Sequence, residues 1–248
     1  MTSANTRIHA LELGPMENFV YLIEDINTRR AAVVDPAWDV PAIIDKANTL
    51  DLQISDILLT HSHHDHINGI EALLEQAPAQ VHLLKPEYEF WDHRLEKPQL
   101  HHGGDRFKLG NSEIQMLHTP GHTPGSACFQ VEDELITGDT LFVYGCGRCD
   151  LHGGDPAQMF NTLRDMKQNL DAEMVIHPGH NYSVAQTCTM AEQIDGNPFL
   201  HFDDKDEFVH YRMDVHDKTR HDPYEPLSQQ QMRVADLLRQ ESVGFERS

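Results

Sequence analysis

Short stretches rich in apolar and β-branched residues follow one another along most of the chain, and turn residues separate them. The stretch at residues 54–60, Ile-Ser-Asp-Ile-Leu-Leu-Thr, has adjacent branched apolar residues and predicts a buried strand. Gly110-Asn111 is a turn signal between two further stretches. The pattern predicts strands at residues 7–13, 19–24, 31–35, 54–60, 81–84, 106–109, 113–118, 126–131, 134–137 and 173–177.

Other segments have the apolar spacing of helices. Asp155-Pro156 is a helix start, because Asp suits the N-cap and Pro suits the first helical position. Residues 87–104 are polar and rich in histidine, so we expect an irregular surface excursion there, and residues 141–154 are expected to form a glycine-rich loop. Helices are predicted at residues 40–50, 68–76 and 155–170, in the segment after Tyr182 to about residue 194, and at residues 228–240.

Two blocks of strands, each followed by helices, indicate an α/β protein. They favour an αβ/βα four-layer sandwich over a regular βαβ alternation. The character of the chain changes near residue 197, and residues 201–224 are dense in Asp, His and Arg. We expect a catalytic domain at residues 1–196 and a C-terminal acidic and helical extension at residues 197–248.

The charge of the 248-residue chain limits its partners. Forty Asp and Glu against 19 Lys and Arg give a net charge of −21, which repels nucleic acid and anionic membrane surfaces. No apolar run approaches the ~18 residues of a membrane span, and the N-terminus lacks the apolar segment of a signal peptide. We therefore expect a cytoplasmic protein, in which the four cysteines do not form a disulfide framework. The oligomeric state is left open.

The strongest chemical signal is the motif His61-x-His63-x-Asp65-His66, directly after the predicted buried strand. Residues two apart in extended backbone point to the same side, so His61 and His63 can converge on one ion. Asp65 and His66 lie where the chain turns into a helix and can face a neighbouring position. The alternative interpretation, a polar surface turn, is disfavoured by four ligand-type side chains in six residues.

Three further candidate ligands follow predicted strands: His122, Asp139 and His180. Functional side chains on such scaffolds usually lie on loops at strand ends. Taken singly, each of the three is better explained as a turn or cap residue. Together with the motif they make five histidines and two aspartates, enough for two ions that share one carboxylate.

These motifs, with Gly121-His122, Thr137-Gly-Asp139 and Gly179-His180, resemble the metal-binding motifs of the metallo-β-lactamase superfamily over roughly residues 10–185. Within it, the chain resembles the glyoxalase II (hydroxyacylglutathione hydrolase) branch. The resemblance implies the metallo-β-lactamase fold and two divalent ions, expected to be zinc, with iron or manganese as alternatives. It implies one ion on His61, His63, His122 and Asp139, and a second on Asp65, His66, His180 and the same Asp139.

Such a centre suits hydrolysis, and we expect a small anionic, thiol-derived substrate, a hydroxyacylglutathione-like thioester, attacked by a metal-bound hydroxide. Asp65 and Asp139 are the expected catalytic carboxylates. The resemblance assigns substrate binding to Arg148 and Tyr182. The plain alternative for Arg148 is an ion pair with Asp150 or Asp155.

Other functions stay open. The segment Gly145-Cys-Gly-Arg148-x-Asp150 resembles the persulfide dioxygenase branch of the same superfamily, which implies one iron on His61, His122 and Asp139. A non-catalytic ligand sensor is a second alternative, and a β-lactamase or lactonase is compatible with the metal motif. We further expect His118 and His177 to orient ligands, and His64 to face solvent or lie behind the ligands. Six other histidines are expected on the surface: His101, His102, His201, His210, His216 and His221.

Overall fold

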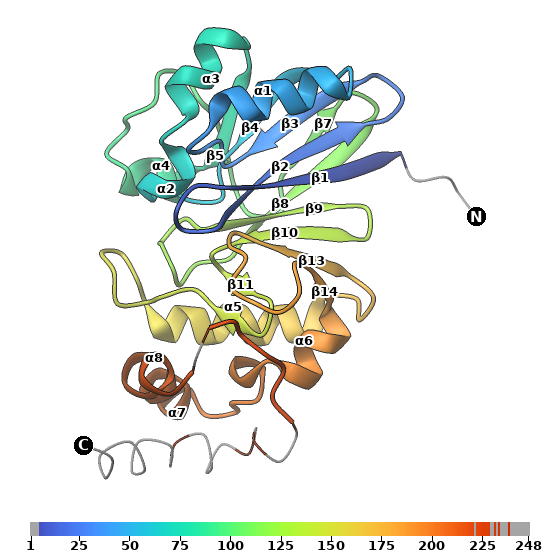
Figure 1. The fold of residues 1–248 in the computed structure, drawn as a ribbon. Helices are drawn as coiled ribbons and strands as arrows, with labels where there is room; N and C mark the ends of the chain where they lie inside the picture. The colour runs from blue at the N-terminus through green and yellow to red at the C-terminus, as the bar shows by residue number, and fades with distance from the viewer. Residues whose placement is uncertain (1–4, 221, 229–230, 232, 234–237, 239–248) are drawn as a thin grey trace.

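The computed structural model describes residues 5–220, 222–228, 231, 233 and 238. Two six-stranded sheets face each other between two layers of helices (Figure 1). The first sheet has the order β1-β2-β3-β4-β5-β6. Its strands are β1 (Thr6–Leu13), β2 (Asn18–Asp25), β3 (Arg30–Val34), β4 (Gln53–Leu58), β5 (Gln80–Leu84) and β6 (Gln99–His101). The first three pair antiparallel, whereas β3 to β6 run parallel.

The second sheet has the order β14-β13-β10-β9-β8-β7, and β10 and β13 are its parallel pair. Its strands are β7 (Arg106–Leu109), β8 (Ser112–His118), β9 (Ala127–Val131), β10 (Glu134–Gly138), β13 (Val175–Pro178) and β14 (Cys188–Thr189). A small hairpin of β11 (Leu141–Phe142) and β12 (Gly145–Cys146) lies within the predicted glycine-rich loop.

Helices cover the outer face of each sheet (Figure 1). The first sheet carries α1 (Val40–Thr49), α2 (His64–Ile67), α3 (Ile70–Gln76) and α4 (Lys85–Phe90). The second carries α5 (Pro156–Asn169), α6 (Met190–Gly196), η1 (Pro198–Leu200), α7 (Lys205–His210), η2 (Tyr211–Val215) and α8 (His216–Thr219). This arrangement confirms the predicted four-layer sandwich.

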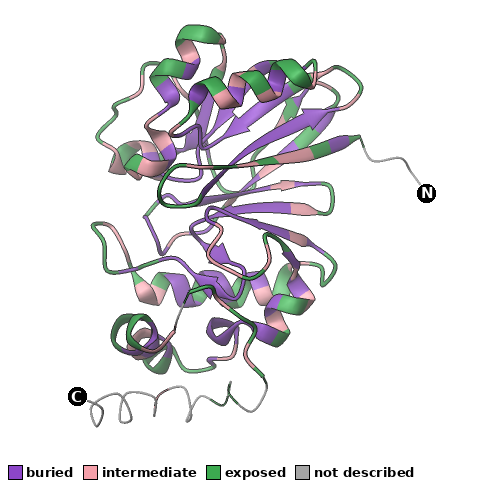
Figure 2. Ribbon diagram, viewed as in Figure 1, coloured by how far each residue is buried: buried purple, intermediate pink, exposed green. Residues whose placement is uncertain are grey.

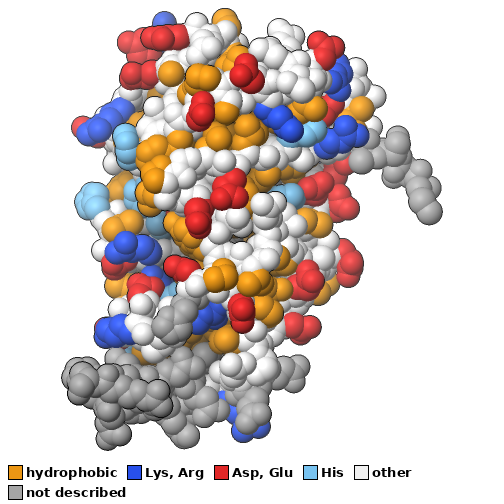
Figure 3. All heavy atoms as spheres, viewed as in Figure 1, with side chains coloured by type: hydrophobic (Ala, Val, Ile, Leu, Met, Phe, Trp, Pro, Cys, Tyr) orange, Lys and Arg blue, Asp and Glu red, His pale blue; other side chains and the backbone are white. Residues whose placement is uncertain are grey.

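Three apolar clusters hold the layers together. The strands supply many of their residues and are largely buried, as Figure 2 shows. One cluster fills the space between the sheets, where Phe129 and Tyr21 are fully buried. A second joins the first sheet to α1 and α3. The third joins the second sheet to α5 and to residues that follow α6. On the outer face drawn in Figure 3, acidic and basic side chains are interspersed.

The structure corrects two predicted segments. Residues 87–104 are not an irregular excursion, because they complete α4 and contain β6, which extends the parallel sheet. The helix after Tyr182 begins only at Met190, because residues 188–189 first pair with β13 and Thr189 then caps the helix. The predicted start of α5 is confirmed: Asp155 accepts hydrogen bonds from the backbone of Ala157 and Gln158.

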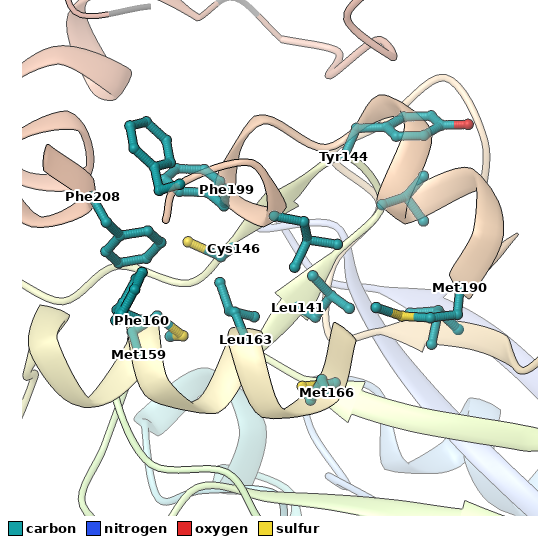
Figure 4. Packing of buried hydrophobic residues seen from close by; sticks show 14 of the residues in the cluster. Leu141, Tyr144, Cys146, Met159, Phe160, Leu163, Met166, Met190, Phe199 and Phe208 are labelled. Atoms are coloured by element: carbon teal, nitrogen blue, oxygen red, sulfur yellow. The ribbon is translucent and has the colours of Figure 1, made fainter. Parts of the chain in front are cut away.

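Residues after α6 pack on the same core as α5. The ring of Phe208 lies against Phe160 of α5 and against Phe199, with centroid distances of 5.5 and 5.7 Å (Figure 4). Asn197 Nδ2 donates to the carbonyl of Gly145 over 3.0 Å, and Arg220 Nη2 donates to that of Tyr144 over 3.3 Å. These residues therefore shape the loop that leads to Arg148. The helix predicted at residues 228–240 lies largely outside the described residues.

All four cysteines are free and buried, in agreement with the expectation that they form no disulfide framework. Among the described residues, no helix has both the length and the apolar character to cross a membrane.

Candidate metal centre

The fold brings the predicted ligands to one edge of the two sheets. β4 ends at Leu58, and His61 follows it after two residues. β10 ends at Gly138 and β13 at Pro178, and because these strands are parallel, Asp139 and His180 leave the sheet at the same edge. His122 comes from the loop between β8 and β9. Four separate loops thus supply the side chains.

Three histidines form the first group of potential ligands. The ligand nitrogens of His61, His63 and His122 all lie within 4.8 Å of one another. His63 Nδ1 is 2.8 Å from His122 Nε2. This spacing places three imidazole nitrogens around a volume that one ion can occupy.

The second group contains Asp65, His66 and His180, again with ligand atoms within 4.8 Å of one another. His66 Nε2 lies 3.2 Å from His180 Nε2. Asp65 Oδ2 is 3.3 Å from His66 Nε2 and 3.5 Å from His180 Nε2. The structure therefore places Asp65 and His66 beside the neighbouring position that the sequence analysis expected, together with His180.

Asp139 lies between the two groups. Its Oδ2 is 3.5 Å from His122 Nε2 and 3.3 Å from His180 Nε2, and its Oδ1 is 3.4 Å from His66 Nε2. Since His122 belongs to one group and the other two histidines to the second, this carboxylate faces both. That position matches a shared ligand.

Unpartnered polar atoms show that the centre fits metal ions. His61 Nε2 and Asp139 Oδ1 are buried and have no hydrogen-bond partner in the described part of the chain. A buried polar atom without a partner is costly, and a metal ion would satisfy both atoms. Imidazole nitrogens with carboxylate oxygens are donors that suit zinc, iron and manganese.

Protonation is also consistent with metal binding. Burial lowers the pKa of His61 well below its usual value and that of His122 to about 4. Burial acts against charge on His66 and His180 as well. For His66, Asp139 together with Asp35 and Asp65 outweighs burial and raises the pKa, and for His180, Asp139 together with the carbonyl of Met16 does the same. Burial alone would raise the pKa of Asp139, yet His180 and His66 hold it well below its usual range. A bound cation would take the place of the protons that these carboxylates retain on the histidines.

Asp35 is a functional residue that the sequence analysis missed. Its Oδ2 lies 3.0 Å from His66 Nδ1, and its two oxygens accept hydrogen bonds from the backbone and hydroxyl of Thr60. The hydroxyl of Thr60 is in turn 3.0 Å from His61 Nδ1. A carboxylate behind a histidine fixes the ring and its tautomer. The signal that could have revealed it is an Asp-Pro pair at the end of β3, the parallel neighbour of β4.

Backbone carbonyls orient two other histidines. His122 Nδ1 lies 2.7 Å from the carbonyl of Arg148, and His180 Nδ1 lies 2.8 Å from that of Met16. The expectation that His118 and His177 orient ligands is wrong. His118 instead bonds the carbonyl of Pro124, and His177 pairs with Glu134.

The other predicted histidine positions differ in outcome. His64 is exposed, as one of its two expected placements requires. His101 and His216 are buried rather than on the surface. His221 lies outside the described residues. His101 hydrogen-bonds His82, and His216 packs against Phe199 in the C-terminal part of the core.

Arg148 and Tyr182 occupy different environments near the centre. Arg148 is exposed and forms a two-pronged ion pair with Asp150, over 2.9 Å from Nε to Oδ1 and 2.7 Å from Nη2 to Oδ2. The Tyr182 ring stacks on His180, with centroids 4.6 Å apart and planes 11° apart. Tyr182 therefore borders the second group of ligands directly, whereas the Arg148 side chain is occupied by a carboxylate of the chain itself.

The two-sheet sandwich, with histidines and aspartates gathered at one edge, can now be compared with known protein families. The family model for the metallo-beta-lactamase superfamily matches residues 13–180. The chain belongs to this superfamily, which confirms the family named from the motifs.

Individual relatives extend the comparison. The chain is 33% identical over 195 residues to a probable polyketide biosynthesis zinc-dependent hydrolase, BaeB, of Bacillus velezensis, covering 79% of this chain and 87% of that protein. It is 36% identical over 174 residues to the hydroxyacylglutathione hydrolase of Aeromonas hydrophila, covering 68% of this chain and 63% of that protein. The crystal structure of ETHE1 from Myxococcus xanthus matches with a TM-score of 0.77 and 27% identity, over 96% of this chain and 99% of that one. The two hydrolases among these relatives support a metallohydrolase.

Proposed function

We propose that this chain is a hydrolase with two divalent metal ions that cleaves small anionic thioesters. The observation that carries the proposal is the set of seven converging donors, two groups of three with Asp139 between them. If the protein bound one ion only, the second group of a carboxylate and two histidines beside it would have no metal to bind. Hydrolases named among the relatives, one of them zinc-dependent, support the same class.

The proposed ligands of the two ions correspond to the two groups of side chains in the structure. His61, His63, His122 and Asp139 would hold one ion, and Asp65, His66, His180 and Asp139 the other, with zinc as the expected metal. When bound, such ions polarise a carbonyl and lower the pKa of water to about 7. The chain keeps the donors in place through Asp35, Thr60 and the carbonyls of Arg148 and Met16.

The charge of the centre favours an anionic substrate. A pair of divalent ions carries four positive charges, of which Asp65 and Asp139 balance two. Asn18 Nδ2 donates to Asp65 Oδ2 over 2.9 Å and so holds this carboxylate towards the other proposed metal ligands.

The leaving group of a thioester also suits this centre. A thiolate leaves readily, so a thioester needs no dedicated acid from the protein.

We place the thiol-carrier end of the substrate near Arg148 and Tyr182. Arg148 presents two N–H groups of its guanidinium to Asp150, in the fork geometry that carboxylates bind. A substrate carboxylate would compete with Asp150 for this fork. Tyr182 stacks on His180 and would border the bound substrate.

Metal analysis and two paired assays test the proposal. Elemental analysis of the purified protein should find two ions per chain. Thiol release from an acyl-glutathione, without oxygen uptake on glutathione persulfide, supports the hydrolase. A single iron per chain and oxygen uptake without thiol release would overturn it.

A persulfide dioxygenase is the second candidate. The ETHE1 structure aligns over 96% of this chain, including most of the residues after α6, and the segment Gly145-Cys-Gly-Arg148-x-Asp150 supports the same branch. This candidate would use one iron on His61, His122 and Asp139. It leaves Asp65, His66 and His180 without a metal-binding role, and for this reason we favour the hydrolase.

A further inference from the structure

Glu87 is a fully buried carboxylate that belongs to neither group of ligands. It lies in the first turn of α4, in the segment that the sequence had suggested to be an irregular surface excursion. Burying a carboxylate is costly unless hydrogen bonds compensate it. The partners that compensate Glu87 therefore indicate its role.

Both oxygens of Glu87 accept hydrogen bonds from the loops that carry the three-histidine group. Oε1 accepts from the backbone N–H and the hydroxyl of Ser62, over 2.7 and 2.6 Å. Oε2 accepts from the hydroxyl of Thr123 over 2.7 Å and from the backbone N–H of Gly125 over 3.1 Å. Ser62 lies between His61 and His63, and Thr123 directly follows His122. One side chain thus joins two loops that come from different sheets.

The packing around Glu87 leaves little freedom for either loop. A Cβ on Gly125 would lie 2.0 Å from the backbone nitrogen of Glu87, so this position requires glycine for α4 to approach. The carbonyl of Thr60 also accepts a hydrogen bond from the backbone of Ala127, over 2.8 Å, at the base of the two loops. The loop that carries Ser62 and the loop that carries Thr123 are therefore both held to the sheets.

We propose that Glu87 is a positioning residue that holds His63 and His122 at metal-binding distance and thereby sets the affinity of the three-histidine group for its ion. It acts through Ser62 and Thr123 and does not contact substrate. The inference rests on the proposed two-ion centre. Its physical basis is that loops held in the binding conformation before the ion arrives lose less conformational freedom when it binds.

Glu87→Gln is the most direct test, because it keeps the shape of the side chain and removes one acceptor. The amide NH₂ would face a backbone N–H, of Ser62 or of Gly125, that now donates to a carboxylate oxygen, so one loop loses this hydrogen bond. Changes behind a metal ligand cost roughly 10–100-fold in metal affinity, and we expect a loss of that size at one of the two ions only.

Asp25 offers a matched control. It is also fully buried and accepts four hydrogen bonds, from the backbone and hydroxyl of Thr28, the backbone of Asn111 and the hydroxyl of Ser112. It lies at the end of β2, whose first residue is beside Asp65. Asp25→Asn should lower stability as Glu87→Gln does, and leave metal affinity unchanged.

The experiment titrates metal-free wild type, Glu87→Gln and Asp25→Asn with zinc against a competing chelator and records thermal unfolding of the same samples. The expected result is a selective loss of affinity for one ion in Glu87→Gln. The inference is overturned if Glu87→Gln binds both ions as wild type does, or if Asp25→Asn loses as much affinity. If Glu87→Gln does not fold, Thr123→Val and Ser62→Ala each remove one of the hydrogen bonds to Glu87. Either should weaken the same ion by a smaller factor, and unchanged affinity in both overturns the inference.

Amide hydrogen exchange of the metal-free proteins separates this inference from the proposed function. Glu87→Gln should speed exchange at Ser62 and Gly125, whereas Asp25→Asn should speed it at Thr28 and Asn111. If wild type binds no zinc, the proposed function fails and the affinity part of the inference fails with it. Unchanged exchange at Ser62 and Gly125 would overturn the contact between the loops itself, whatever the zinc result.

Discussion

The two ends of the sandwich treat buried polar groups in opposite ways, although one strand joins them. β2 is an eight-residue strand that begins at Asn18, which donates to Asp65 of the metal centre, and ends at Asp25. At the Asp25 end, both carboxylate oxygens accept hydrogen bonds from hydroxyl and backbone donors. At the other end, His61 Nε2 and Asp139 Oδ1 have no partner in the described residues.

This difference distinguishes a structural polar cluster from a functional one. Among the described residues, both oxygens of Asp25 have hydrogen-bond partners, so this carboxylate contributes to stability and has no unpartnered atom for a metal ion. The atoms at the metal end instead crowd around one small volume, where Asp65 and Asp139 both face Nε2 of His180. Such an arrangement is costly without a cation, so the metal end gives up stability to gain binding capacity.

The largest expected effect comes from Asp139→Asn. An amide offers one oxygen where the carboxylate faces both groups of ligands, so the protein should lose bound metal. Turnover should fall roughly a thousandfold, which corresponds to about 4 kcal/mol in the activation barrier. Elemental analysis and thiol-release kinetics measure the two effects. Retention of two ions with full turnover would show that Asp139 is not shared.

Asp35→Asn should have the next largest effect, because it removes the negative acceptor behind His66 and leaves every ligand in place. We expect a loss of roughly 10–100-fold in affinity for the ion of the second group. Zinc competition with a chelator resolves the two ions. A loss confined to the three-histidine group would contradict the role assigned to Asp35.

Substitution of Arg148 tests whether substrate binds beside the metal centre. Arg148→Ala should raise KM about tenfold, since a hydrogen bond to a charged group contributes about 1.5–3 kcal/mol and its exposure reduces this value. The variant should keep kcat and metal content, because the proposed role is uniform binding. Asp150→Ala, which frees the guanidinium, should instead lower KM. An unchanged KM in Arg148→Ala would reduce this residue to an ion-pair partner of Asp150.

Asp25→Asn should have the smallest effect on function, and it tests the other end. We expect unchanged metal content and a loss of about 1–3 kcal/mol in the free energy of unfolding, because buried donors lose an acceptor. Burial acts to raise the pKa of Asp25, but hydrogen bonds from Ser112 and Thr28 outweigh it and lower the pKa. The stabilisation is therefore present above about pH 4 and is lost as the pH falls further. Denaturant titrations should show the gap between wild type and variant narrowing below that pH.

Local sequence signals predicted much of this molecule. The strands next to the ligands have compact apolar runs, and the motif from His61 to His66 carries its chemistry within six residues. Asp139 and His180 could be identified because each follows a strand at a glycine-marked loop. Their convergence at one edge also needed the parallel pairing of β10 and β13, which the resemblance to a family supplied in place of a local signal.

The residues that the sequence did not reveal act through distant partners. The hydrogen-bond donors to Glu87 lie 25, 36 and 38 positions away along the chain. Asp35 and His66 are 31 positions apart. His216 is buried because side chains such as Phe199 and Tyr224 pack against it. Burial that depends on such contacts leaves no periodic pattern in the nearby sequence.

The contacts made by Asn197 and Arg220 have a consequence for the order in which the enzyme is made. All seven donors are encoded within the first 180 residues, whereas the bonds to the carbonyls of Tyr144 and Gly145 come from residues 197 and 220. A ribosome therefore produces the complete donor set before it produces the residues that shape the approach to Arg148. On the proposed assignments, the metal ligands are thus translated before the residues that shape the region proposed to bind substrate.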